Sequence, residues 1–313
     1  MATIVDNNLK EEIIKTLIWF DTFSYPLTSF EIYKYLNYKT SYPEVVLALE
    51  DLSDKIVFNN GFFFLRNREA LVTERLKKFN YFNRKNKKAM AFIKLISFWP
   101  SILGVAVSNI VGDHNLRDDG DIDLLVISTP NRVWSSRFIC TFIAKILGLR
   151  PNNKTKKDKI CLSFYISSDN LNLESYLFND RDLYFIYCLN DLHIIYNYQG
   201  IWEKFYQANT FLSKYLPNRS KSLIYLDKQV IATRFKLFSI NKKIGDKIEK
   251  LLKKIQLKIM PMALKQQANK STGVLLEDNI IKLFLEDKRL DFINRFDNRI
   301  KEIENNKNNY YDH

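Results

Sequence analysis

Cysteine and histidine are scarce in this sequence. Its 313 residues include only 3 of each. The cysteines, Cys140, Cys161 and Cys188, are odd in number, widely spaced and surrounded by apolar residues. We therefore expect reduced, buried thiols rather than a disulfide framework or a zinc site. Three scattered histidines also argue against a histidine-rich metal centre.

Long hydrophobic runs are missing too. No apolar run approaches the ~20 residues that span a bilayer, so no membrane partner is expected. The first residues, MATIVDNNLKEE, are polar and acidic and lack the pattern of a signal peptide, which predicts a cytoplasmic protein. The chain is long enough for two or three small domains, each able to bury a core.

Negative charge is outweighed by positive charge. The net charge is +13. Such a charge suggests a polyanionic partner such as RNA, but a protein that is merely soluble can carry it equally well. The basic excess begins after residue 66 and returns between residues 214 and 270. A basic first domain is therefore excluded, whereas basic later segments are predicted.

Residues 1–66 are predicted to form a winged-helix-like domain, because their pattern indicates three helices followed by a β-hairpin. Thr28 is the predicted N-cap of the second helix, Pro43 opens the third, and an Asn-Gly turn joins the two strands. The third helix carries acidic residues and no lysine or arginine, a surface that repels phosphates. We favour a protein-contact or structural role for this domain over DNA binding.

The rest of the chain predicts an α+β protein. Residues 67–97 read as a basic helical connector, whose Arg84 to Lys88 cluster is either a solvated face or a contact to RNA or nucleotide phosphate. Residues 98–216 are predicted to form a small mixed-sheet domain, with a helix over 180–196. Residues 217–313 are predicted to be helical. One helix there has an apolar stripe from Ile244 to Ile259, which we expect to pack on the sheet domain while lysines face solvent; the alternative is that its basic face holds a nucleic-acid acceptor.

The stretch from Ile102 to Ser128 contains two short apolar runs bounded by turn residues, and each run is typical of a buried strand. Asp121 and Asp123 open the second run. Because alternate strand residues share a face, their carboxylates are expected side by side. Such a pair raises its own pKa values unless a cation is present, and Mg²⁺ prefers oxygen ligands. The pair by itself favours an exposed strand end, with a metal site as the alternative, and only the motif around it shifts the balance toward a metal site.

This stretch resembles the signature of the nucleotidyltransferase superfamily related to DNA polymerase beta. There a Gly-Ser pair after one strand precedes Asp-hydrophobic-Asp-hydrophobic on the next. Asp121-Ile122-Asp123-Leu124 matches the second half, and Ser108-Asn109 stands at the position of Gly-Ser. The whole chain is similar to a bacterial group of nucleotidyltransferase-like proteins with an N-terminal winged-helix-like domain. The matching pieces are SYPLT at 24–28, HNLRD at 114–118, RVW at 132–134 and DKICLSF at 158–164.

The resemblance implies a Mg²⁺ site, with Mn²⁺ as an alternative ion, held by Asp121 and Asp123. It also implies a nucleoside triphosphate substrate such as ATP, whose phosphates Ser108 and Asn109 would touch. A third carboxylate is expected near the next strand, residues 160–166, which contains no acid itself. Asp158 at its start is the assigned catalytic candidate, and one further acid, Asp169, lies just past its end.

Two arginines complete the predicted site. Arg132 and Arg137 lie in the first turns of the helix that follows the aspartate strand. They either lean toward the nucleotide phosphates or are simple surface charges.

Two functions compete at this point. The preferred hypothesis is an Mg²⁺-dependent nucleotidyltransferase that moves a nucleoside monophosphate to an acceptor, with RNA and protein as the acceptor classes left open. The alternative is a catalytically inactive nucleotidyltransferase fold that serves as a binding or regulatory module. The altered Gly-Ser pair and the acid-free third strand favour the alternative, whereas the retained aspartate pair favours the enzyme.

Overall fold

The computed structural model describes residues 6–152, 155–219, 231, 236 and 241–309. Within this part of the chain the protein combines helices with a mixed six-stranded sheet and a separate two-stranded antiparallel sheet. The predicted mixture of helices and sheet is therefore confirmed at the level of class. None of the described helices is both long and apolar enough to cross a bilayer.

The N-terminal part contains the three predicted helices and the hairpin. They are α1 (Asn7–Asp21), α2 (Ser29–Tyr35), α3 (Tyr42–Asp51), β1 (Ile56–Asn59) and β2 (Phe62–Leu65). Thr28 and Glu31 form the predicted capping box at α2, and Asn60 and Gly61 both take positive φ in the hairpin turn. A single bridge from Leu27 to Phe63 ties the chain before α2 to the hairpin.

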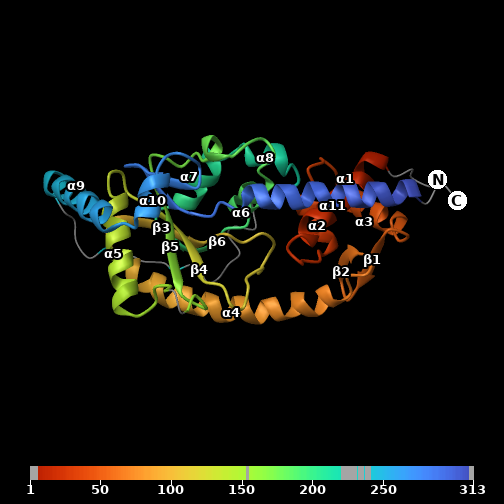
Figure 1. The fold of residues 1–313 in the computed structure, drawn as a ribbon, viewed down its shortest axis with the longest axis horizontal. Helices are drawn as coiled ribbons and strands as arrows, with labels where there is room; N and C mark the ends of the chain where they lie inside the picture. The colour runs from red at the N-terminus through yellow and green to blue at the C-terminus, as the bar shows by residue number, and fades with distance from the viewer. Residues whose placement is uncertain (1–5, 153–154, 220–230, 232–235, 237–240, 310–313) are drawn as a thin grey trace.

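Helix α4 (Ala70–Ile96) is the predicted connector, and it runs from the N-terminal part along the sheet (Figure 1). The sheet has the strand order β6-β3-β4-β5-β8-β7. Its strands are β3 (Ile102–Val107), β4 (Ile122–Ser128), β5 (Ile160–Ser167), β6 (His193–Asn197), β7 (Val274–Leu276) and β8 (Ile280–Leu283). Among the six described strands of this sheet, the central β4 and β5 pair in parallel, and the other neighbours pair antiparallel.

Alternate residues of β4 enter two different cores. Leu124 and Val126 pack with α4 and with α5 (Val133–Ile146), whereas Leu125 and Ile127 pack with α6 (Leu183–Asn190) and α7 (Ile201–Ala208). The second core continues into α1 and α2 without interruption. The N-terminal helices therefore share a core with one face of the sheet.

The short elements and the C-terminal helices complete the described structure. They are the 3₁₀ turn η1 (Glu174–Tyr176), α8 (Leu212–Tyr215), α9 (Lys242–Ile259), α10 (Met262–Gln267) and α11 (Arg289–Asn309). Figure 1 shows α11 beside the N-terminal helices and α9 near α5 at the opposite end of the molecule.

Three expectations about these regions are wrong. Residues 217–313 are not only helical, because β7 and β8 extend the sheet, with β8 paired to β5. The apolar run 180–196 divides into α6 and strand β6. Helix α9 turns its apolar stripe outward, with Ile259 75% exposed, and packs on α5 through buried Glu249 and Gln256. Backbone N–H groups at the start of α5 bond to the Glu249 carboxylate, which makes that polar contact favourable.

Candidate functional site

Asp121 and Asp123 lie at the start of β4, where the chain leaves the long loop after β3. Asp123 shares its face of the strand with Leu125, so it points toward the core that contains α6. Both side chains are half-buried. Ligand atoms of Asp121, Asp123 and Cys161 all lie within 4.8 Å of one another. The structure therefore brings the predicted carboxylate pair together.

Burial and mutual repulsion act on this pair. Burial and the neighbouring Asp121 charge raise the pKa of Asp123 to about 6, although hydrogen bonds from Cys161 and Asn109 work in the opposite direction. A carboxylate with a raised pKa is destabilised in its ionised form. A bound cation would remove this penalty, so the electrostatics favour cation binding between the two groups.

Ser108 and Asn109 follow β3 directly and reach the same place. The Ser108 amide donates to the Asp123 carbonyl over 2.9 Å, which keeps the end of β3 against β4. The Ser108 hydroxyl is buried with no hydrogen-bond partner among the described residues. Asn109 has φ of 56°, a left-handed conformation that asparagine tolerates better than most residues. The positive φ of this pair therefore falls on Asn109, its second residue.

Cys161 occupies the third corner beside the aspartates, on β5 opposite Asp123. Burial and the two carboxylates raise the pKa of the Cys161 thiol well above its ordinary value. A neutral thiol is a poor ligand for hard ions such as Mg²⁺, which take carboxylates and phosphate oxygens. Asp121 and Asp123 alone fit Mg²⁺ when a substrate supplies further oxygen ligands.

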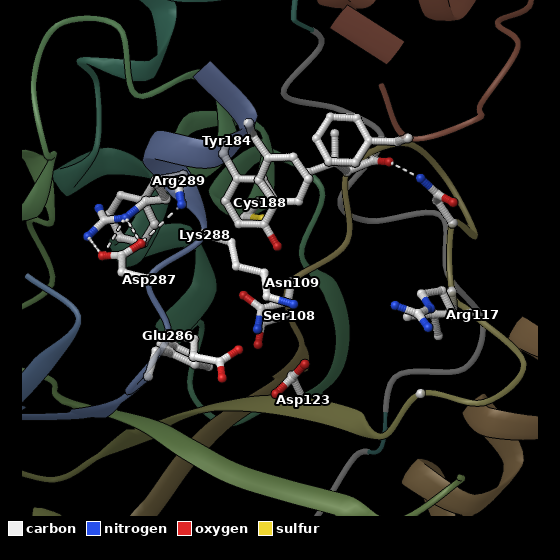
Figure 2. Close-up of a pocket in the computed structure, with 18 of the residues that line it drawn as sticks. Ser108, Asn109, Arg117, Asp123, Tyr184, Cys188, Glu286, Asp287, Lys288 and Arg289 are labelled. Atoms are coloured by element: carbon white, nitrogen blue, oxygen red, sulfur yellow. Dashed lines mark hydrogen bonds and ion pairs between the residues drawn. The ribbon is translucent and has the colours of Figure 1, made fainter. Parts of the chain in front are cut away.

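A pocket of about 860 Å³ opens in front of these residues. It is formed by the β3–β4 loop, α6, the end of β8 and the start of α11 (Figure 2). Its aromatic wall includes Tyr184 stacked on Phe292, with ring centroids 4.8 Å apart. Its basic lining residues are Lys78, Arg117, Lys156, Lys282, Lys288, Arg289 and Arg295. The pocket therefore combines carboxylates, cations and flat apolar surfaces.

Arg132 and Arg137 are not among the described residues that line this pocket. Arg132 binds Asp246 over 2.8 Å, and Arg137 donates to Gln256, so both arginines fasten α9 to α5. Helix α5 covers the face of the sheet opposite the one that Asp123 shares with Leu125. The expectation that these arginines lean toward nucleotide phosphates is not supported by this placement.

Asp158 is also absent from the described pocket lining and from the carboxylate cluster. Its carboxylate forms ion pairs with Arg84 and Lys88, each over 2.9 Å, and with Lys85 over 3.0 Å. Its backbone N–H donates to the Gly120 carbonyl, which Lys85 also contacts. Three cations hold the pKa of Asp158 below its ordinary value. The structure thus uses Asp158 to anchor the loop before Asp121, and gives the predicted third acid a structural position instead.

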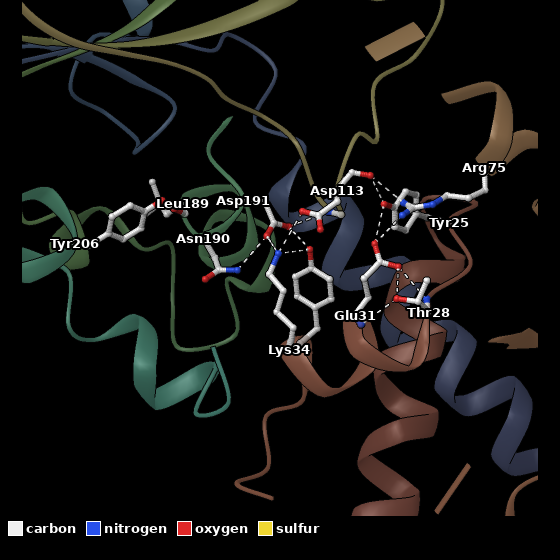
Figure 3. Close-up of polar contacts among 12 residues, drawn as sticks. Tyr25, Thr28, Glu31, Lys34, Arg75, Asp113, Leu189, Asn190, Asp191 and Tyr206 are labelled. Carbon is white, nitrogen blue, oxygen red and sulfur yellow. Dashed lines mark hydrogen bonds and ion pairs between the residues drawn. The ribbon is translucent and has the colours of Figure 1, made fainter. Parts of the chain in front are cut away.

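Residues of the N-terminal helices contact the first half of the loop between β3 and β4 (Figure 3). The buried Asp191 carboxylate accepts from Lys34 over 3.0 Å, from Tyr35 over 2.8 Å and from the Gly112 amide over 2.9 Å. The Asp113 carbonyl accepts from Arg75 of α4 over 3.0 Å. The loop between Ser108 and Asp121 is therefore positioned by residues distant in sequence, a function that no sequence pattern indicated.

The segment after β7 contributes residues that the sequence did not single out. Lys282 on β8, and Glu286 and Lys288 beyond it, line the pocket, and Figure 2 shows Glu286 and Lys288 directed toward the space near Asp123 and Asn109. No pattern in the sequence marked these three residues, which lie beyond the basic segment that ends at residue 270. No family model, curated protein or solved structure matches this chain.

Proposed function

We propose that this protein is an Mg²⁺-dependent nucleotidyltransferase. The observation that supports it best is the carboxylate pair Asp121 and Asp123, which faces a pocket whose walls are basic and aromatic. Such a pocket fits a nucleoside triphosphate, because its phosphates need cations and its base needs a flat apolar surface. We also propose a polymerase-beta-like fold for the sheet region, a winged-helix-like N-terminal part and a cytoplasmic location.

Each pocket residue has a defined task in this proposal. Asp121 and Asp123 would hold Mg²⁺, which supplies charge neutralisation at the transferring phosphate. The unpaired Ser108 hydroxyl donates to a phosphate oxygen. Lys288 offsets phosphate charge, and the Tyr184 ring stacks on the base.

The acceptor must lose a proton as it attacks the α-phosphorus. Among the acids of the described pocket lining, Glu286 is exposed and makes no hydrogen bond or ion pair with a described residue. Figure 2 shows its carboxylate directed into the pocket on the side of Asp123. Glu286 is therefore our candidate for the general base, in place of Asp158. The basic surface leaves RNA and protein open as acceptors.

The test uses purified protein, Mg²⁺ and each α-labelled nucleoside triphosphate, and it scores pyrophosphate release and label transfer to protein or added RNA. Asp121→Asn and Asp123→Asn are each expected to lower transfer roughly a hundredfold or more. Asp169→Asn is the matched control, because Asp169 is exposed and outside the described pocket lining. Full transfer in either pair variant would refute the proposed role of the pair.

A second candidate function is a nucleotide-binding module without transfer activity. It is favoured by one observation, the neutral thiol of Cys161 at the corner where a third acid would lie. This module predicts Mg²⁺-dependent nucleotide binding that Asp123→Asn abolishes, with no label transfer to any acceptor. Appearance of transfer in Cys161→Asp alone would identify the thiol as the cause of inactivity.

A further inference from the structure

Lys282 is a buried lysine inside the pocket. It lies on β8 opposite Phe164 of β5, and its exposed fraction is 4%. Its ammonium nitrogen lies 4.7 Å from the ring centroid of Phe185, 5.7 Å from that of Phe284 and 5.8 Å from that of Phe164. Three aromatic rings therefore surround the amine, which contributes to the pocket wall.

No hydrogen bond or ion pair joins the Lys282 amine to any of the described residues. The nearest acids are already committed to another cation. Arg289 binds Asp182 over 2.7 Å and Asp287 over 2.8 Å, and Arg289 itself is buried. A lysine whose side chain is buried, with aromatic rings around its amine and no carboxylate of its own, lacks the partner that such a residue normally has.

Burial is the main effect that disfavours the protonated form of Lys282. Burial and the Arg289 charge lower its pKa to about 7, against the opposing effect of Asp287, Asp182 and Cys188. These groups come from the loop after β8, from the N-cap of α6 and from α6 itself. An anion that reached the amine from the pocket would add the missing opposite charge and raise its pKa.

We propose that Lys282 is a phosphate-binding residue that takes up a proton when the anion binds. The ligand class is an oligophosphate, either the tail of the nucleotide or the released pyrophosphate. This inference rests on the proposed function for its choice of ligand. The geometry supports a phosphate over a carboxylate ligand, because Lys288 and Arg295 line the same pocket and only a multiply charged anion would satisfy several cations together.

The experiment is calorimetric titration of the protein with inorganic pyrophosphate, without metal, in buffers of different ionisation enthalpy. The variation of the observed heat between buffers gives the number of protons taken up. At about pH 8 wild type is expected to take up roughly one proton more than Lys282→Met, and the difference should vanish near pH 5, where the amine is already charged. Lys282→Met should also weaken pyrophosphate binding about tenfold or more.

Lys288→Met is the matched control, because Lys288 is an exposed lysine of the same pocket. It should weaken binding while leaving proton uptake as in wild type. Equal proton uptake or equal affinity in wild type and Lys282→Met would overturn the proposal. Asp121→Asn separates the two hypotheses, since it should abolish transfer yet keep the proton uptake. The pH dependence of wild type alone tests the idea if Lys282→Met does not fold.

Discussion

Removal of the Asp158 charge tests whether this residue stabilises the loop before Asp121 or acts as a catalytic acid. Asp158→Asn keeps the shape of the side chain but leaves Lys85, which is 0% exposed, without its carboxylate. Breaking a buried ion pair by removing one partner typically costs about 3 kcal/mol or more. Arg84 and Lys88 have side chains 36% and 48% exposed, so each of their pairs adds at most about 1 kcal/mol. We expect the unfolding free energy to fall by about 3 to 5 kcal/mol.

The pH dependence of this loss has a definite sign. The pKa of Asp158 is lowered in the folded state relative to its ordinary value of 3.8. Its stabilising contribution is therefore complete above about pH 4 and disappears as the pH falls through the lower folded-state pKa. The difference between wild type and Asp158→Asn should be constant from neutral pH down to about pH 4 and shrink only below it.

The measurement is urea denaturation of both proteins over this pH range, together with the thermal midpoint. A loss of about 3 kcal/mol corresponds to roughly 5 °C in a chain of this size. Asp119→Asn is the control, because its ion pair with Arg117 has side chains 69% and 77% exposed and should change stability by less than about 0.5 kcal/mol. Unchanged stability of Asp158→Asn together with lost transfer would show that Asp158 is a catalytic acid and that our anchoring argument is wrong.

Three further variants test other parts of the site. Gly112→Ala should destabilise by about 2 kcal/mol, since Gly112 has φ of 91° and a Cβ would approach the Tyr25 ring to 2.5 Å; wild-type thermal stability would contradict this. Lys34→Met should lower the unfolding free energy, measured by urea denaturation, by about 3 kcal/mol, because it leaves the buried Asp191 carboxylate without its cation. A loss below about 1 kcal/mol would show that this ion pair does not hold the loop. Asp123→Asn should stabilise the metal-free protein by about 1 to 3 kcal/mol near pH 8, because the pKa of Asp123 is raised to about 6, and this gain should vanish near pH 4. Lower stability of Asp123→Asn in chelator at pH 8 would refute the repulsion argument.

Much of the local structure could be predicted from short stretches of sequence. The capping box at Thr28 and the Asn60-Gly61 turn depend on neighbouring residues and form as expected. Asp121 and Asp123 come together because alternate residues of one strand share a face. These features need no information about the rest of the chain.

The amphipathic pattern of α9 shows the limit of such reasoning. Its period correctly predicts a helix but does not specify which side meets the protein. The start of α5 has backbone donors that need an acceptor, and Glu249 on the polar side of α9 supplies it. The outward direction of Ile259 follows from that contact, which only the packed structure reveals.

The sequence by itself determined the three N-terminal helices, the hairpin and the adjacent carboxylates, because each follows from the period and chemistry of nearby residues. Tertiary structure alone decided which charges serve the site. Asp158 is paired with Arg84, which lies 74 residues away in the sequence. Lys282 lines the pocket and has no ion-pair partner among the described residues. An ionisable side chain acts according to its burial and the charges around it, and these depend on which distant segments fold against it.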